Sequence, residues 1–204
     1  MIEFKTETHE YFVDSIKKPC VSDILAGAGL IDLSFINKIK LQKASKFGKA
    51  IHLACQLWDL NKLDMSSVSA PLIPYLNNWK KFVKDYNILH FAKENIERII
   101  YSKIWDYAGT LDRVAFIDNK KIIIDIKSGS LYPTTAIQLA GYSLAYTEMT
   151  KIIINQRWIV QLNKKSYKVT ECKEQSDESV FIGAVQVYKY KLKNNLIRKN
   201  KNEI

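Results

Sequence analysis

The clearest hydrophobic pattern in the chain lies between residues 112 and 127, where two apolar runs flank a short polar stretch. Asp118, Asn119 and Lys120 form that stretch, and asparagine is a usual turn residue because it tolerates the left-handed conformation. The pattern predicts two strands joined by a turn. The second run, 122–127, is almost wholly apolar, which is typical of a central strand covered on both faces.

Strand side chains alternate between two faces, so the second strand separates its isoleucines from its charges. Ile122, Ile124 and Ile126 share one face, whereas Ile123, Asp125 and Lys127 share the other. Burying charges is costly unless they are paired or bind a metal. Asp112 can face the same place if the hairpin register allows it, and Mg²⁺ prefers carboxylate, carbonyl and water oxygens. From those residues alone, an Asp-x-Lys at a strand end is more often a surface ion pair than an active site.

Apolar spacing predicts further elements on either side of this hairpin. Strands are expected at 10–14, 96–101, 152–162 and 167–172, and helices at 47–59, 75–86, 134–149 and 180–192. A short helix is also expected between Ser22 and the glycines at 27 and 29, and residues 33–45 are expected to be helical with soft boundaries. A polar loop at 61–74 is expected to pass over the candidate site.

Two side chains on these elements, His52 and Glu97, have two interpretations each, and two more, Gln138 and Tyr142, share a helix face. His52, at the edge of an apolar helix stripe, is either a boundary residue or a metal ligand. Glu97, flanked by apolar residues, is either half of a structural ion pair or a site carboxylate. Gln138 and Tyr142 are four apart, so they share a helix face that can lie over the strand end at residue 127.

Composition fits an ordinary globular protein, with 47% hydrophobic and 25% charged residues in 204. We expect one domain over residues 1–192 and a frayed basic tail over 193–204. The net charge of +10 favours a polyanionic partner over a merely solvated surface. Three scattered cysteines make a disulfide scaffold or zinc ribbon unlikely to form and fit a reducing cytosol. We expect no signal peptide and no membrane span.

Five short segments together resemble the PD-(D/E)xK nuclease superfamily, in its RecB-like and phage exonuclease branch. They are Gly48–His52, Glu97, Gly109–Val114, Asp125–Gly129 and Gln138–Tyr142, in the family's order and spacing. The resemblance implies an α/β (α+β) fold, a restriction-endonuclease-like core in which helices flank a central mixed β-sheet. Leu111 stands where the family name has proline, and three cysteines cannot supply the iron–sulfur module of some members, so we expect no cluster.

The resemblance also implies a role for each matching residue. Asp112 and Asp125 would bind metal, with the backbone carbonyl of Ile126 and the ring of His52 as further ligands. Lys127 would orient the attacking water and stabilise the developing phosphate charge. The roles of the remaining residues concern the surroundings of the metal: Gln138 and Tyr142 would support the site or the DNA, and Glu97 is a further candidate site carboxylate.

The expected activity is Mg²⁺-dependent hydrolysis of DNA, with Mn²⁺ as a substitute, most simply by an exonuclease acting on double-stranded ends. Single strands are also considered as substrates. The expected setting is recombination or repair in the cytoplasm of a bacterium or a phage-infected host. Three alternatives stay open: an endonuclease of repair, restriction or defence; a catalytically silent nucleic-acid-binding module; and a protein that binds a recombinase or single-strand annealing partner. Self-association into a homo-oligomer is also open.

Overall fold

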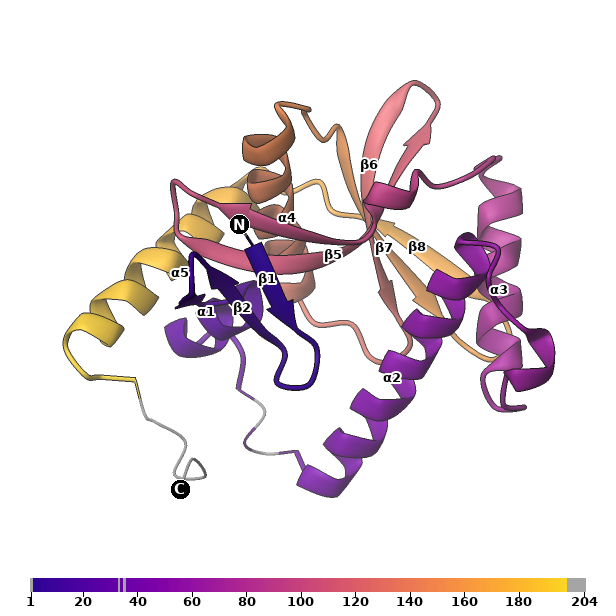
Figure 1. Cartoon of the computed structure of the whole chain (residues 1–204), viewed down its shortest axis with the longest axis horizontal. Helices are drawn as coiled ribbons and strands as arrows, with labels where there is room; N and C mark the ends of the chain where they lie inside the picture. The colour runs from indigo at the N-terminus through magenta and orange to yellow at the C-terminus, as the bar shows by residue number, and fades with distance from the viewer. Residues whose placement is uncertain (1, 33, 35, 198–204) are drawn as a thin grey trace.

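The computed structural model describes residues 2–32, 34 and 36–197 (Figure 1). Its elements, in chain order, are β1 (Ile2–Lys5), β2 (Glu10–Val13), β3 (Ile16–Lys18), α1 (Val21–Ala28), α2 (Lys38–Asp59), the 3₁₀ turn η1 (Met65–Ser67), α3 (Ile73–Asp85), the 3₁₀ turn η2 (Lys93–Asn95), β4 (Ile96–Ser102), β5 (Tyr107–Ile117), β6 (Lys120–Lys127), α4 (Thr134–Thr150), β7 (Gln156–Leu162), β8 (Tyr167–Glu171) and α5 (Ser176–Lys193). Residues 198–204 of the expected tail lie outside the described residues.

A five-stranded mixed sheet in the order β4-β5-β6-β7-β8 forms the centre of the molecule. β6 pairs antiparallel with β5 and parallel with β7, and the parallel step is made by a crossover through α4. The predicted hairpin is confirmed, since Asp118 and Asn119 join β5 to β6 with positive φ values of 48° and 61°. The expected class, a mixed α/β fold with helices flanking a central mixed sheet, is likewise confirmed.

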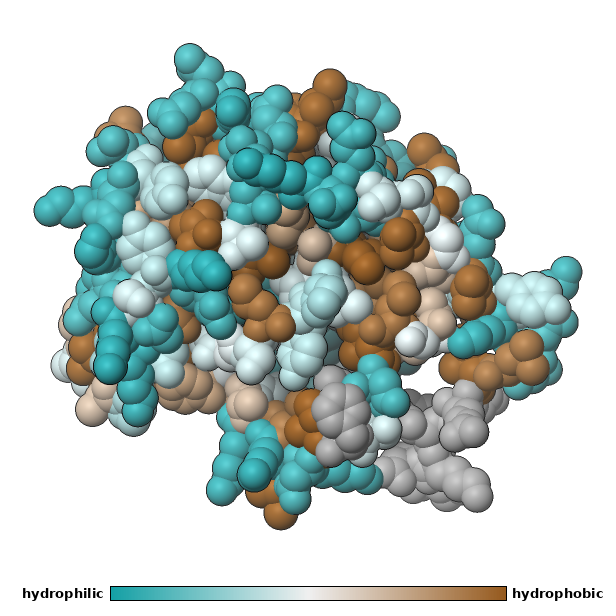
Figure 2. All heavy atoms as spheres, turned by 180° about the vertical axis from the view of Figure 1, so that it is seen from behind, coloured by the Kyte–Doolittle hydropathy of each residue, from teal (hydrophilic) through white to brown (hydrophobic). Residues whose placement is uncertain are grey.

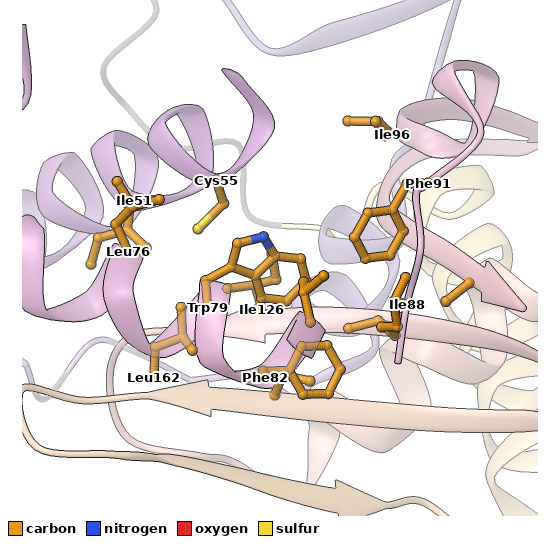
Figure 3. Close-up of a cluster of buried hydrophobic side chains, with 14 of the residues drawn as sticks. Ile51, Cys55, Leu76, Trp79, Phe82, Ile88, Phe91, Ile96, Ile126 and Leu162 are labelled. Carbon is orange, nitrogen blue, oxygen red and sulfur yellow. The ribbon is translucent and has the colours of Figure 1, made fainter. Parts of the chain in front are cut away.

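The two faces of this sheet bury different sets of helices. On one face, Ile122, Ile124 and Ile126 pack against α2 and α3, around the fully buried Trp79 (Figure 3). On the other face, Ile123 packs with residues of α1, α4 and α5. The alternation read from the sequence is therefore the alternation of the core, and it explains why β6 is apolar on both faces.

A second, three-stranded sheet of β1, β2 and β3 lies beside the start of β5 (Figure 1). The hydroxyls of Tyr11 and Thr110 are 2.8 Å apart, and the N–H of Ala108 donates to the carbonyl of Pro19 at 2.9 Å. Sequence spacing predicted a single strand around 10–14, and the neighbouring strands are short pieces with weak local signals.

Helix boundaries differ from the predicted ones. The helical stretch expected at 33–45 and the helix expected at 47–59 join in one helix, α2, which begins at Lys38 because Asn37 Oδ1 accepts the N–H groups of Ile39 and Lys40 and caps it there. α5 begins at Ser176 rather than residue 180, and Asp177 pairs with Arg157 at 3.0 Å. Local charge pairing extends helices beyond their apolar stripes.

The surface mixes polar and apolar residues. Figure 2, which views the molecule from behind, shows hydrophobic patches set among hydrophilic side chains. Among the helices of the described chain, none is both long and apolar enough to cross a membrane.

Candidate functional site

The candidate site lies where the regular backbone pairing of β5 with β4 and β6 is interrupted. Backbone pairing between β5 and β6 begins at Arg113 and Ile124, so Asp112 and Asp125, one step beyond, face each other without pairing. Asp112 Oδ2 instead accepts the N–H of Ile126 at 2.6 Å. A side-chain carboxylate thus takes a position that a backbone carbonyl holds in a continuous ladder.

The same irregularity occurs on the other side of β5. Ile96 pairs with Arg113 and Arg98 pairs with Leu111, whereas Glu97, between them, makes no regular pair with Asp112. Glu97 has a φ of +47°, which is unfavourable for a residue with a side chain. Such backbone strain is concentrated at functional sites. Here it lies at one of the residues that the sequence singled out.

Three of the predicted residues bring possible metal-binding atoms together. His52 Nδ1 lies 3.4 Å from Asp112 Oδ1 and 3.9 Å from Glu97 Oε1. One ligand atom from each of the three residues lies within 4.8 Å of the others. The other ring nitrogen, His52 Nε2, lies 2.8 Å from the carbonyl oxygen of Ile126. That carbonyl therefore borders the site, as the resemblance implies.

The charges of this group affect one another strongly. Burial disfavours a charged His52 ring, but attraction and hydrogen bonding to Asp112, together with Glu97, raise the pKa of His52 to about 10. Burial likewise disfavours a charged Asp112, but His52, Lys127 and the Ile126 N–H lower the pKa of Asp112 to about 2. The positive His52 ring and the Asp112 carboxylate therefore stabilise each other's charged forms.

Asp125 lies beside these atoms but makes a different pair. Its Oδ1 and Oδ2 are 2.9 Å and 2.8 Å from Lys127 Nζ, and only Oδ1 accepts in hydrogen-bonding geometry. Burial raises the pKa of Asp125 to about 6, with Asp112 adding to the rise and Lys127 opposing it. Two neighbouring carboxylates thus have pKa values on opposite sides of the ordinary value, a pattern typical of acid–base sites.

Lys127 is held by the following helix. Its Nζ lies 3.5 Å from Gln138 Oε1, and Gln138 Nε2 donates to the Tyr142 hydroxyl at 3.0 Å. Burial lowers the pKa of Lys127, but Asp125 and Asp112 outweigh burial and raise it. The ammonium therefore stays charged, and with three N–H donors it keeps one beyond those aimed at Asp125 and Gln138.

A buried ion pair that the sequence reading missed supports the site from behind. Arg113 Nε donates to Asp59 Oδ2 at 2.6 Å and Arg113 Nη1 donates to Glu97 Oε1 at 2.9 Å. Trp79 Nε1 donates to the other oxygen of Asp59 at 2.9 Å. Asp59 follows His52 by seven residues, hence on the same helix face, and that spacing is the signal that could have found it.

The site opens into a cavity of about 470 Å³. Each of the charged residues His52, Glu97, Asp112, Asp125 and Lys127 lines it. Its outer wall includes the aromatic side chains of Phe4, His9 and Tyr11 from the N-terminal sheet. The contribution of that sheet was not predicted, since it depends on tertiary docking.

The predicted position of the 61–74 loop is wrong. None of its residues lines the cavity, and Leu63, Val68 and Leu72 pack instead on the core beneath α2 and α3.

The first half of α2 is strongly basic and extends from the body of the molecule (Figure 1). Between Lys38 and Trp58 the helix has no acidic residue. Its exposed lysines are Lys38, Lys40, Lys43, Lys46 and Lys49. Lys49 also lines the cavity. The basic half of α2 (residues 38–49) therefore leads directly to the candidate site.

Comparisons with known proteins add little. No protein-family model matches the chain, and no curated protein matches it. A solved structure described as "Crystal structure of SSO0001" is similar over 69% of this chain and 73% of that chain, with 17% sequence identity and a TM-score of 0.37. A similarity this weak carries no argument about fold or function, so the site must be judged on its own geometry.

Proposed function

We propose that this protein is a metal-dependent deoxyribonuclease with a restriction-endonuclease-like core. The observation that carries the proposal is the meeting of His52, Glu97 and Asp112 with the Asp125–Lys127 pair in one cavity. Carboxylates that can hold a metal cation, beside an ammonium group held in place, form an arrangement suited to phosphodiester hydrolysis.

The residues present fit a divalent cation. Two carboxylate oxygens and an imidazole nitrogen converge within 4.8 Å, and the negative charge there is strong enough to hold a proton on His52 to about pH 10. Mg²⁺ or Mn²⁺ would be held by His52, Glu97 and Asp112, with Asp125 and the Ile126 carbonyl beside them. When bound, such an ion lowers the pKa of a water and neutralises phosphate charge.

The chain's own residues supply the remaining requirements. Lys127, charged because its pKa is raised, acts as a hydrogen-bond donor and positive charge toward the phosphate rather than as a base. Asp125 and Gln138 fix the ammonium, and Tyr142 fixes the Gln138 amide. This preorganisation lets Lys127 stabilise charge as it develops, without reorienting during the reaction.

DNA is the substrate that the charge distribution favours. The basic half of α2 presents lysines without an intervening acid, and the whole chain has a net charge of +10. Lysines on one helix contact phosphates and position a strand without reading its sequence. We propose double-stranded ends as the preferred substrate, in keeping with the phage exonuclease branch that the sequence resembles.

Matched linear and closed circular duplex DNA test this function directly. The protein is incubated with each in Mg²⁺ or Mn²⁺, beside an EDTA control and the Lys127→Ala variant. We expect loss of the linear substrate alone, and no cleavage in EDTA or by Lys127→Ala.

The other outcomes are equally informative. Cutting of both substrates would make the protein an endonuclease. Binding without cutting would identify a silent nucleic-acid-binding module, and full activity of Lys127→Ala would overturn the assignment of the site.

A further inference from the structure

A second cavity, more apolar than the first, adjoins the candidate site. Its volume is about 800 Å³, and it lies between α1, the basic half of α2 and the start of α4. Lys127 and Gln138 line both cavities. A ligand that contacts Lys127 in the first cavity can therefore extend along the protein surface into the second.

The second cavity exposes apolar side chains that packing does not explain. Leu30 is 41% exposed and Tyr132 is 48% exposed, and both line it. Concave apolar surface with a few polar groups is typical of a ligand site. The exposed ring of Tyr132 offers a face on which a planar group can stack.

The charged residues that line the second cavity indicate which class of ligand it can bind. Lys40 lines the cavity, and no carboxylate within the described ranges pairs with it. The carboxylate of Asp32, which also lines the cavity, accepts the N–H of Ser34 within its own loop at 2.8 Å. A ligand with a flat apolar part and an anionic part matches these walls, and a nucleotide has both.

We propose that this second cavity binds an unpaired nucleobase of the strand being cut, next to the phosphate at Lys127. The base would stack on Tyr132 and its phosphate would lie near Lys40. A base in this cavity cannot remain paired with its complement, so the preferred substrate has unpaired nucleotides at the cut. This inference rests on the proposed nuclease function and extends it to substrate structure.

Filling the cavity tests the proposal. Ala44 lines it and is exposed on α2, so Ala44→Phe places a ring there. Ser179→Phe is the control, since Ser179 is exposed on α5, lines neither cavity and lies outside the basic half of α2. Tyr132→Ala removes the stacking surface instead, and thermal unfolding shows that each variant folds.

Single-stranded oligonucleotides carrying one abasic site, moved stepwise along the strand, provide the cleavage readout. Removing the base at one position should slow the wild type by roughly 5- to 100-fold, the range expected for one lost base–aromatic stack. Ala44→Phe should slow cleavage of the intact strand similarly, and should lose nothing further on the abasic strand. Tyr132→Ala should behave in the same way, and Ser179→Phe should stay within about twofold of wild type.

A binding readout separates this inference from the nuclease proposal. In EDTA, wild type and Ser179→Phe should quench the fluorescence of an oligonucleotide that contains 2-aminopurine, and Ala44→Phe should not. Quenching without any cleavage in Mg²⁺ or Mn²⁺ would support the base site and reject the nuclease. Cleavage with no position-dependent abasic effect and no quenching would overturn the base site and leave the nuclease standing. Unchanged cleavage and quenching in Ala44→Phe would also overturn it, and would make the cavity a docking site for another protein.

Discussion

Two clusters of charged side chains meet at Glu97, and they differ in access to solvent. The closed cluster consists of Asp59 and Arg113, whose side chains are both 0% exposed. The open cluster consists of His52, Asp112, Asp125 and Lys127, with His52 27% and Lys127 30% exposed. Both bury charge, but only the open one lines a cavity.

The difference lies in whether a ligand can reach the charged groups. In the closed cluster, Arg113 Nε and Nη1 donate to Asp59, Glu97 and the Asp112 carbonyl, and the guanidinium lies over the face of Trp79. Arg113 Nη2 is buried without a hydrogen-bond partner. In the open cluster the carboxylates bind their cation across a space that solvent and ligands can enter. Burial alone therefore does not identify a functional site, whereas burial combined with access does.

The largest expected effect is on the closed cluster. Arg113→Met leaves Asp59 buried without its cation, so the free energy of unfolding should fall by about 3–5 kcal/mol. Chemical denaturation measures this change in the free energy of unfolding. The double variant Asp59→Leu/Arg113→Met removes both charges and should recover much of the loss; if it is as unstable as the single variant, the loss is due to packing and not to charge.

Replacing a cation by methionine in the open cluster should mainly lower the rate of cleavage. Lys127→Met removes one charged donor, and loss of such a donor lowers turnover by roughly 10²–10³-fold. Its unfolding midpoint should fall less than that of Arg113→Met, because Asp125, whose pKa is already raised to about 6, can take up a proton when it loses its cation. A comparison of Lys127→Met and Arg113→Met in both assays tests the contrast. A large loss of stability in Lys127→Met would mean that both clusters are structural.

Glu97 belongs to both clusters, so its neutral isostere should have an intermediate effect. Glu97→Gln keeps the shape but weakens the charge near His52, and we expect Mn²⁺ affinity to fall about 10- to 100-fold, the usual cost of altering groups around a metal. Isothermal titration with Mn²⁺ measures this affinity. Glu94→Gln, exposed on the neighbouring turn, is the control, and equal affinities for the two variants would exclude Glu97 from the metal site.

The smallest expected effect is on the pH dependence of stability without metal. The pKa of His52 is raised from 6.5 to about 10 in the folded state, so folding binds the proton more tightly. This stabilisation is complete below about pH 6.5 and is lost as pH rises toward 10. In EDTA, the unfolding temperature should therefore fall between pH 6.5 and 9.

Two controls sharpen that measurement. His52→Gln should flatten the slope, and His90→Gln, an exposed histidine elsewhere, should keep it. Mn²⁺ should also flatten it by replacing the proton. A slope that His52→Gln leaves unchanged would show that this ring does not hold the proton.

The sequence by itself determined the central hairpin and most of the residues that converge there. Alternation of Ile122 to Lys127 between two faces is a local property of an extended chain, so it could be read directly. The spacing of Gln138 and Tyr142 likewise placed them on one helix face, and the structure brings that face to Lys127. Roles in metal binding and catalysis remain predictions.

Only the tertiary structure decided which charges share a site and which are sealed away. Asp112 and Arg113 are adjacent in sequence, yet one enters the open cavity and the other lies beneath Trp79. The N-terminal sheet and both cavities depend on docking between segments far apart in the chain. Local periodicity fixes the face on which a side chain lies, but solvent access depends on what packs against that face, and that is a long-range property.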